Sequence, residues 1–294
     1  MPSPKKPPAH VNLLRKFVTE HVKAQAQQQE GLVERRYQRW LGFMIVSAIL
    51  DQVRDEGGDP VFLLKGGVAM ELRLGLSARA TKDYDAAFRE RSGDMLERLD
   101  EALATGFGDF GVTRTEIEEI QETGAKRTDL KLSYKGRSWQ TVRLELAPSE
   151  GEAGQEIDRV PAIPMDPVGI EGPREVPCVG VRYQIAQKLH ACTTEPGPGR
   201  QNDRSRDLID LLLLRDLLSE EADEDRKELR KVRAACQEIF DLRDQQPWPP
   251  TITVYANWRD TYPREATELG LSLSDIDQAA QQVQRSVEEA EAAL

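Results

Sequence analysis

One stretch, residues 61–88, constrains the fold more than any other part of the chain. An apolar run at 61–64 is followed by Lys65-Gly66-Gly67, by a segment of helical character at about 68–76, and by a second strand-like run that begins at Asp83. Strand, tight turn, helix and strand in this order favour a sheet with the helix packed on it. The sequence therefore predicts a domain of mixed α/β or α+β class, built around this stretch.

The glycine pair has the character of a phosphate-binding turn. Glycine tolerates a positive φ and, because it lacks a side chain, lets a ligand approach the backbone closely. Where a strand enters a helix, Gly66 and Gly67 would present amide groups beside the positive end of the helix dipole, and phosphate binds readily at such a point. Most Gly-Gly pairs are only turns, so the pair by itself identifies no function.

Asp83 and Asp85 are spaced as two metal ligands on one face of a strand. Side chains two residues apart point to the same side of a strand, which leaves Tyr84 on the other side. Adjacent carboxylates repel unless a cation lies between them, and enzymes that move phosphoryl or nucleotidyl groups hold Mg²⁺ in this way. Most Asp-x-Asp pairs are solvated strand ends, but this pair follows the glycine turn across a loop with Arg79 and Lys82. The combination predicts a nucleotide-handling site that uses metal ions.

A longer pattern resembles a known family. The residues that carry it are Lys65-Gly66-Gly67, Arg73-Leu74-Gly75, Arg79, Thr81 and Asp83-x-Asp85, followed by 185–191 and 206–211. This pattern resembles the nucleotidyltransferase toxins of the AbiEii/AbiGii type, including the mycobacterial MenT toxins, within the DNA polymerase β-like superfamily. The resemblance covers roughly residues 61–214, with weaker similarity at 257–259. It departs at Val68, where the superfamily often has Ser or Thr, and at Arg206, where it often has Lys.

The resemblance implies a fold and an activity that the residues alone do not give. The fold would be a two-lobed polymerase β-like nucleotidyltransferase, with a small mixed sheet and a helical C-terminal lobe. The activity would be transfer of a nucleoside monophosphate from an NTP, with Mg²⁺ or Mn²⁺ as cofactor. Some MenT proteins add nucleotides to the 3′ end of tRNA, so the implied acceptor is tRNA and the implied result is blocked translation. A cognate antitoxin is the implied protein partner.

The superfamily commonly supplies a third carboxylate from a strand beside the Asp-x-Asp strand, and Glu145 is the best-placed acidic residue for that role. It lies in a predicted strand at 139–146, where apolar residues alternate with Arg143 and Glu145. The alternative is that Arg143 and Glu145 form an ordinary solvated face of the sheet. The sequence leaves both interpretations open.

A predicted helix that begins near Val181 places a lysine on its apolar face. Lys188 lies within the stripe formed by Ile185, Leu189 and Cys192. A lysine on a buried face is costly unless it is paired. Its aliphatic stem could extend along the apolar surface. The family match favours the other possibility, in which Lys188 points into a cleft and holds the triphosphate of the nucleotide.

The next predicted helix, 206–218, carries Asp207 and Asp210 among leucines. Asp207 has a structural alternative, because an acidic residue in the first turn interacts favourably with the helix dipole. Asp210 has none, since a buried carboxylate needs a cation, which either Lys188 or the bound metal and nucleotide would supply. Asp210 is therefore predicted as a catalytic residue and Asp207 as a nucleotide-binding residue.

The net charge limits how the chain could bind RNA. With 40 basic and 51 acidic residues the net charge is −11, so the chain has no general attraction for nucleic acid and would need a local basic surface. Residues 1–40 hold three acidic residues and eight basic ones, namely Lys5, Lys6, Arg15, Lys16, Lys23, Arg35, Arg36 and Arg39. The alternative is a solubilising face on helices packed beside the catalytic domain.

Two further features favour a cytoplasmic protein. No apolar run approaches the roughly 20 residues that a membrane helix needs. The cysteines, Cys178, Cys192 and Cys236, are odd in number and lack metal-ligand spacing, so we expect reduced thiols.

The predicted organisation has four segments: a basic helical segment (1–57), a nucleotidyltransferase core (58–150), a linker or lid (151–180) and a helical C-terminal lobe (181–294). The predicted catalytic residues are Asp83, Asp85, Lys188 and Asp210. The predicted nucleotide-binding residues are Lys65, Gly66, Gly67, Arg79 and Asp207, and the predicted metal ligands are Asp83, Asp85 and Glu145. Two rival functions remain: transfer of the nucleotide to a protein hydroxyl, and nucleotide binding without transfer.

Overall fold

The computed structural model describes residues 6–25, 33–90, 93–120, 124–219 and 225–293. The chain forms two compact units, one of residues 1–149 with 157–179 and one of residues 150–156 with 180–294. Within the described residues the first unit contains a sheet and four α-helices, and the second contains five α-helices. The predicted division into four segments stays a prediction.

The sheet of the first unit is mixed, as the sequence predicted. Its strands within the described ranges are β1 (Phe62–Lys65), β2 (Asp83–Phe88), β3 (Phe110–Arg114), β4 (Glu118–Ile120), β5 (Ala125–Tyr134), β6 (Arg137–Pro148), β7 (Ile157–Pro161) and β8 (Glu175–Val179). They lie in the order β3-β5-β6-β2-β1-β8-β7, and β4 pairs with β5. Strand β2 runs antiparallel to β1 and parallel to β6, and β8 runs parallel to β1. The strand that carries both predicted metal ligands is therefore central.

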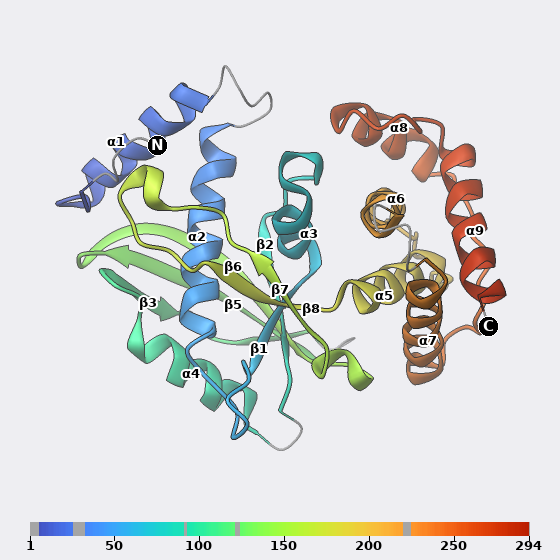
Figure 1. The fold of residues 1–294 in the computed structure, drawn as a ribbon, viewed down its shortest axis with the longest axis horizontal. Coiled ribbons are helices and arrows are strands. Elements are labelled where there is room, and N and C mark those ends of the chain that lie inside the picture. Colours follow the sequence, from blue (N-terminus) through green and yellow to red (C-terminus); the bar gives the residue numbers. More distant parts are fainter. Residues whose placement is uncertain (1–5, 26–32, 91–92, 121–123, 220–224, 294) are drawn as a thin grey trace. The chain divides into compact units, whose positions relative to one another are not determined.

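The described part of this unit also contains α-helices (Figure 1). They are α1 (Val11–Gln25), α2 (Glu34–Leu50), α3 (Gly66–Leu74) and α4 (Met95–Thr105), with short 3-10 turns at Gly75–Ser77 and Asp166–Val168. The strand, turn, helix and strand predicted at 61–88 are present as β1, α3 and β2, and β2 begins at Asp83 as predicted. The predicted linker, 151–180, includes β7 and β8, which pair with each other in the sheet.

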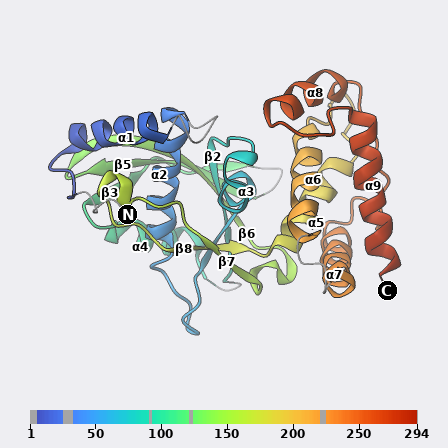
Figure 2. The same cartoon turned by 45° about the horizontal axis from the view of Figure 1, so that its top comes forward.

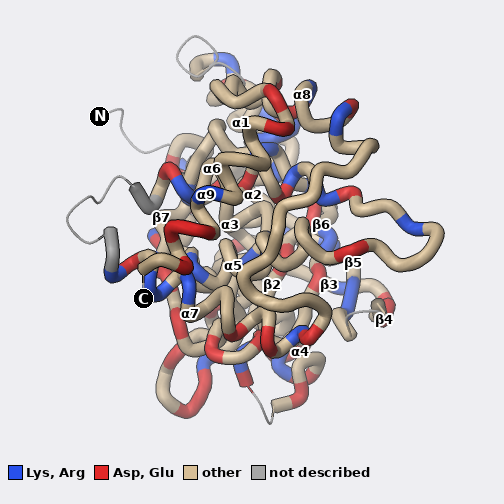
Figure 3. Tube along the Cα trace, turned by 90° about the vertical axis from the view of Figure 1, so that its right-hand side faces the viewer, with Lys and Arg blue, Asp and Glu red and all other residues tan. Residues whose placement is uncertain are grey.

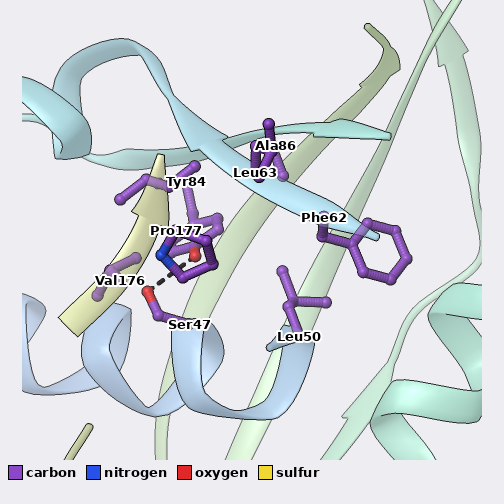
Figure 4. Close-up of a pocket in the computed structure, with 9 residues that line it drawn as sticks. Ser47, Leu50, Phe62, Leu63, Tyr84, Ala86, Val176 and Pro177 are labelled. Atoms are coloured by element: carbon purple, nitrogen blue, oxygen red, sulfur yellow. Dashed lines mark hydrogen bonds between the residues drawn. The ribbon is translucent and has the colours of Figure 1, made fainter. Parts of the chain in front are cut away.

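Helix α2 covers the face of the sheet to which Tyr84 points. The hydroxyls of Ser47 and Tyr84 lie 2.8 Å apart, and the rings of Phe43 and Tyr84 have centroids 6.0 Å apart. Figure 4 shows Ser47 pointing toward Tyr84, with Leu50 and Val176 among the apolar residues around them. A buried tyrosine hydroxyl needs such a partner. Because side chains alternate along a strand, Tyr84 in this core places its two neighbours, the predicted metal ligands, on the opposite face.

The second unit is helical in the part that the structure describes. Its helices are α5 (Val181–Thr193), α6 (Ser205–Ser219), α7 (Asp225–Arg243), α8 (Trp258–Glu268) and α9 (Ile276–Ala292), preceded by a 3-10 turn at Gly151–Gly154 (Figure 2). Leu189, Cys192, Cys236 and Ile239 are buried where these helices pack together. The expected mixture of a sheet with a helical C-terminal part is thus confirmed.

Two further expectations concern the state of the cysteines and membrane-spanning helices. Each of the three cysteines is a buried free thiol, as predicted. Within the described residues, no helix combines the length and the apolar character needed to cross a membrane.

Candidate active site

The turn between β1 and α3 requires glycine at two successive positions. Gly66 has a φ of 64°, in the left-handed region where a side chain is strained. A Cβ atom on Gly66 would overlap the carboxylate of Asp85, and one on Gly67 would lie 2.7 Å from the hydroxyl oxygen of Thr81. Bare backbone at the start of α3 therefore lies directly against a carboxylate from β2 and a hydroxyl from the loop before it.

Asp85 belongs to a row of charged residues that crosses four adjacent strands. Lys65 on β1 lies opposite Asp85 on β2. Asp85 lies opposite Glu145 on β6, and Glu145 lies opposite Arg127 on β5. Residues that lie opposite each other in neighbouring strands share a face of the sheet, so the order is cation, anion, anion, cation. We call Lys65, Asp85, Glu145 and Arg127 the carboxylate row; Asp83 lies two residues before Asp85 and shares its face.

The predicted third carboxylate is engaged by a guanidinium. The Nε and Nη2 atoms of Arg127 donate to Oε1 of Glu145 over 2.9 and 2.7 Å. This hydrogen bond raises the pKa of Arg127. Among the described residues, no three or more His, Cys, Asp or Glu side chains are gathered so that they could hold a metal ion. The structure therefore brings Glu145 beside Asp85 in the sheet but bonds its carboxylate to Arg127.

Asp83 and Asp85 nevertheless fit a divalent cation that binds together with a nucleotide. Both are half-buried on one face of β2. Mg²⁺ usually keeps several waters and is held by one or two carboxylates plus substrate phosphates, rather than by a complete set of protein ligands. Two carboxylates beside the glycine turn meet this requirement, so these two residues would hold the metal.

A buried carboxylate outside the predicted site holds the loop that leads into β2. Glu71, one turn after the glycine pair on α3, is 1% exposed and accepts a hydrogen bond from the backbone N–H of Thr81 over 2.6 Å. The indole N–H of Trp40 also donates to Glu71, and the Arg36 Nε lies 3.5 Å from it. Burial raises the pKa of Glu71. In the sequence, Glu71 stands out only as an acidic residue within the apolar run 67–72. Its partners Trp40 and Arg36 lie on an earlier helix, so the sequence alone does not identify them.

Arg36 does not contribute to an exposed basic surface. It is buried and donates hydrogen bonds to the carbonyl oxygens of Gly75, Leu76 and Ala78, near the end of α3. The exposed basic residues in the described part of 1–40 are Lys6, Arg15, Lys16, Lys23 and Arg35; Lys5 and Glu30 lie outside the described residues. Figure 3 shows basic and acidic positions mixed along the chain. The basic surface near the N-terminus is thus smaller than the sequence predicted.

In the second unit, α5 and α6 bring Lys188 together with Asp207 and Asp210. The Nζ atom of Lys188 lies 3.0 Å from Oδ1 of Asp207 and 2.6 Å from Oδ2 of Asp210. All three residues are buried, and Asp210 is 0% exposed. Lys188 thus supplies the cation that a buried Asp210 requires. We call these residues the lysine cluster; their catalytic and nucleotide-binding roles stay predictions.

His190, also on α5, is a neutral structural group. Its Nδ1 atom lies 3.1 Å from the hydroxyl of Thr194 and 3.2 Å from Nη1 of Arg243, and its ring packs edge-on against Phe240. Burial, with Arg243 nearby, lowers the pKa of His190 to about 4. Since this imidazole accepts a hydrogen bond from a cation, it is uncharged near neutral pH.

Structural comparison finds several nucleotidyltransferases at low similarity. MenT4, a nucleotidyltransferase toxin from Mycobacterium tuberculosis H37Rv, has 19% identity and a TM-score of 0.43 over 95% of this chain and 98% of its own. An antigenic nucleotidyltransferase-like protein from Paracoccidioides brasiliensis has 15% identity and a TM-score of 0.38 over 70% and 96%. The antibiotic-resistance factor ANT(2″)-Ia has 14% identity and a TM-score of 0.36 over 69% and 91%. Similarities this low carry no argument about function.

Comparison of the sequence gives stronger evidence about the family than comparison of the structure does. A comparison with curated proteins finds no match. The family model described as "Nucleotidyl transferase AbiEii toxin, Type IV TA system" matches residues 48–290, which is most of the chain and includes both the carboxylate row and the lysine cluster. The chain belongs to the AbiEii family of nucleotidyltransferase toxins of type IV toxin–antitoxin systems.

Proposed function

We propose that this toxin transfers a nucleoside monophosphate from an NTP to the 3′ end of a tRNA, with Mg²⁺ or Mn²⁺ as cofactor, and thereby blocks translation. One observation supports the proposal most: the turn at Gly66 and Gly67 lies directly against the carboxylate of Asp85. A nucleotide bound with its metal needs this combination, because the cation is shared between carboxylates and phosphate oxygens.

The residues of the first unit would divide between phosphate and metal. The amides of Gly66 and Gly67 would bind phosphate oxygens at the start of α3. The half-buried side chains of Lys65 and Arg79 would neutralise phosphate charge. Asp83 and Asp85 would hold the cation, which when bound stabilises the charge on the triphosphate and on the leaving group.

The transfer itself is an in-line displacement. The oxygen of the acceptor hydroxyl forms a bond to the α-phosphorus, while the bond from that phosphorus to the pyrophosphate oxygen breaks. The hydroxyl proton passes to solvent and pyrophosphate leaves. No covalent intermediate with the protein is required, so rate acceleration would come from positioning and charge stabilisation.

The lysine cluster keeps its predicted roles within this proposal. Lys188 would bind the triphosphate through its ammonium group, and Asp207 and Asp210 would hold that group in place. The distances of 3.0 and 2.6 Å from Lys188 to the two carboxylates support this positioning role.

The choice of acceptor rests on the family. The resemblance to MenT toxins favours tRNA, and membership of a toxin–antitoxin family supports a cognate antitoxin as partner. Exposed lysines and arginines near the N-terminus, such as Arg15, Lys16 and Lys23, could contact RNA phosphates. Both tRNA and NTPs are abundant in the cytoplasm, where we expect the protein to act.

A labelling experiment tests the proposal. The purified protein is incubated with Mg²⁺ and each α-³²P-labelled NTP in turn, with total tRNA in one set of reactions and total bacterial protein in another. We expect label in tRNA with the wild type and none with Asp85→Asn. Asp129→Asn is the matched control, because Asp129 is a partly exposed acid on β5 that pairs with Arg143.

The same experiment separates the rivals. Label in protein instead of tRNA would replace the proposed acceptor with a protein hydroxyl. Metal-dependent nucleotide binding without any label would favour a binding protein. Transfer that persists in Asp85→Asn would contradict the proposed metal site itself.

A further inference from the structure

The ion pair at the end of the carboxylate row competes with any metal ion for Glu145. Both hydrogen bonds from Arg127 go to a single oxygen, Oε1 of Glu145. Glu145 lies opposite Asp85 across a parallel pair of strands, so the two carboxylates share a face and are neighbours. A cation bound by Asp85 would attract Glu145 from one side while Arg127 holds it from the other.

Arg127 is placed so that it can release this carboxylate. Its side chain is 38% exposed, and that of Glu145 is 28% exposed. Its backbone is fixed, because β5 pairs with both β4 and β6 at this residue, but the guanidinium lies at the solvated face of the sheet. An exposed ion pair of this kind is weak, whereas a divalent cation carries twice the charge of a guanidinium and binds carboxylates directly.

We propose that Arg127 is a positioning residue that controls whether Glu145 serves as a metal ligand. Without metal, the guanidinium neutralises Glu145 and keeps it from repelling Asp85. When divalent cation occupies the neighbouring carboxylates, Glu145 leaves Arg127 and joins the cation. The inference rests on the proposed function, since it assumes that Asp83 and Asp85 bind a divalent cation.

This arrangement makes Glu145 a conditional ligand. Asp83 and Asp85 alone suffice for a cation that arrives with a nucleotide. A third carboxylate is needed when a second cation binds near the first, as in two-metal sites that stabilise both the attacking and the leaving oxygen. Before the substrates are present, the ion pair with Arg127 would thus keep Glu145 from binding a second cation.

Mn²⁺ binding tests the inference without any turnover. Electron paramagnetic resonance of free Mn²⁺, measured without and with a non-hydrolysable NTP analogue, gives the affinity and number of bound ions for the wild-type chain, Arg127→Gln, Glu145→Gln and the double variant. We expect Arg127→Gln to bind Mn²⁺ roughly fivefold more tightly than the wild type, because the competing ion pair is gone. In the double variant this gain should disappear, since the released carboxylate is absent.

Arg143→Gln is the control for simple loss of positive charge. Arg143 lies on β6 opposite Asp83, on the same face of the sheet, but its guanidinium pairs with Asp129 at 3.3 Å. If Arg127→Gln binds Mn²⁺ no more tightly than the wild type, the inference is overturned. It is also overturned if the gain persists in the double variant or if Arg143→Gln gives the same gain.

Failure of the proposed function has a different signature. If neither the wild type nor Arg127→Gln binds Mn²⁺ even with the NTP analogue present, and Asp85→Asn changes nothing, the metal site is contradicted and the inference about Arg127 falls with it. If the wild type binds Mn²⁺ through Asp85 but Arg127→Gln gives no gain, the inference about Arg127 alone is overturned.

Discussion

The carboxylate row and the lysine cluster use the same kinds of residue in opposite surroundings. In the row, two adjacent carboxylates lie half-buried on the face of a sheet, with a cation at each end. In the cluster, one ammonium lies between Asp207 and Asp210, and all three groups are buried. The carboxylates of the row are half-buried at a partly exposed face, whereas the cluster is buried and pairs its charges internally.

Because of this difference, the two regions should respond differently to the loss of one charged side chain. A buried charge is tolerated only when its partner is present, so removing one member leaves an uncompensated charge and destabilises the fold. Adjacent carboxylates at a half-exposed site repel each other, so neutralising one of them costs the fold little. We therefore expect substitutions in the row to change activity with little effect on stability, and substitutions in the cluster to lower stability as well as activity.

The largest expected effect is the loss of activity in Asp85→Asn. The amide cannot replace the charge that a divalent cation requires, and we expect transfer to fall by about a thousandfold or more, which corresponds to about 4 kcal/mol in the activation barrier. Label incorporation at fixed NTP measures the rate. Thermal unfolding should show a melting temperature equal to or above that of the wild type; a large drop would place Asp85 with the buried cluster and remove the contrast.

Asp210→Asn should differ from Asp85→Asn by losing stability together with activity. It leaves the buried Lys188 with one carboxylate instead of two, and we expect the free energy of unfolding to fall by about 3 kcal/mol. Urea unfolding followed by circular dichroism measures the change. Asp216→Asn is the control, because Asp216 is on the same helix but its side chain is 61% exposed. Equal stability of the two variants would contradict the structural role of the cluster.

His190 is a further case of burial in the second unit, and it is buried as an uncharged side chain. Its pKa is lowered by burial to about 4 from an ordinary value of 6.5. The unfolded chain therefore takes up this proton at a higher pH than the folded chain does. The contribution to stability is complete above pH 6.5 and is lost as the pH falls toward 4, by at most about 3 kcal/mol.

Urea unfolding between pH 7 and pH 4 checks this prediction. We expect His190→Gln to lose less stability over that range than the wild type loses. If the slope of His190→Gln matches that of the wild type, the proton linkage is not at His190.

Local chemistry made the stretch at 61–88 predictable. The glycine pair, the apolar run before it and the alternation around Tyr84 act within a short segment, and each agrees with the others. Helix periodicity also predicted that Asp210 lies among leucines and needs a cation, with Lys188 as one of two candidates, and the structure pairs it with Lys188. These inferences needed no knowledge of contacts between distant strands.

Contacts across the sheet and between distant helices could not be predicted. The hydrogen bond from Arg127 to Glu145 depends on the register of β5 against β6, and the burial of Glu71 depends on Trp40 from a helix earlier in the chain. Prolines concealed the strands within 151–180: Pro161 ends β7 and Pro177 lies inside β8. Proline removes a ladder donor and therefore argues against a strand when only the sequence is read.

Substitution of a single glycine tests the contact that supports the proposed function. Gly66 and Gly124 share a φ of 64°, so alanine at either position should cost about 1–2 kcal/mol in left-handed strain. Of these two, only Gly66 would place its new Cβ over a carboxylate, that of Asp85; at Gly124 no atom of the described residues lies within 4 Å. The two variants therefore match in backbone strain and differ in the position of Asp85. Urea unfolding should show a loss of stability in both variants, larger in Gly66→Ala because its Cβ also displaces Asp85, while label incorporation should fall in Gly66→Ala and stay near wild type in Gly124→Ala. Equal activity would mean that Asp85 need not lie against the turn, and the closest link between the phosphate-binding turn and the carboxylate row would be lost.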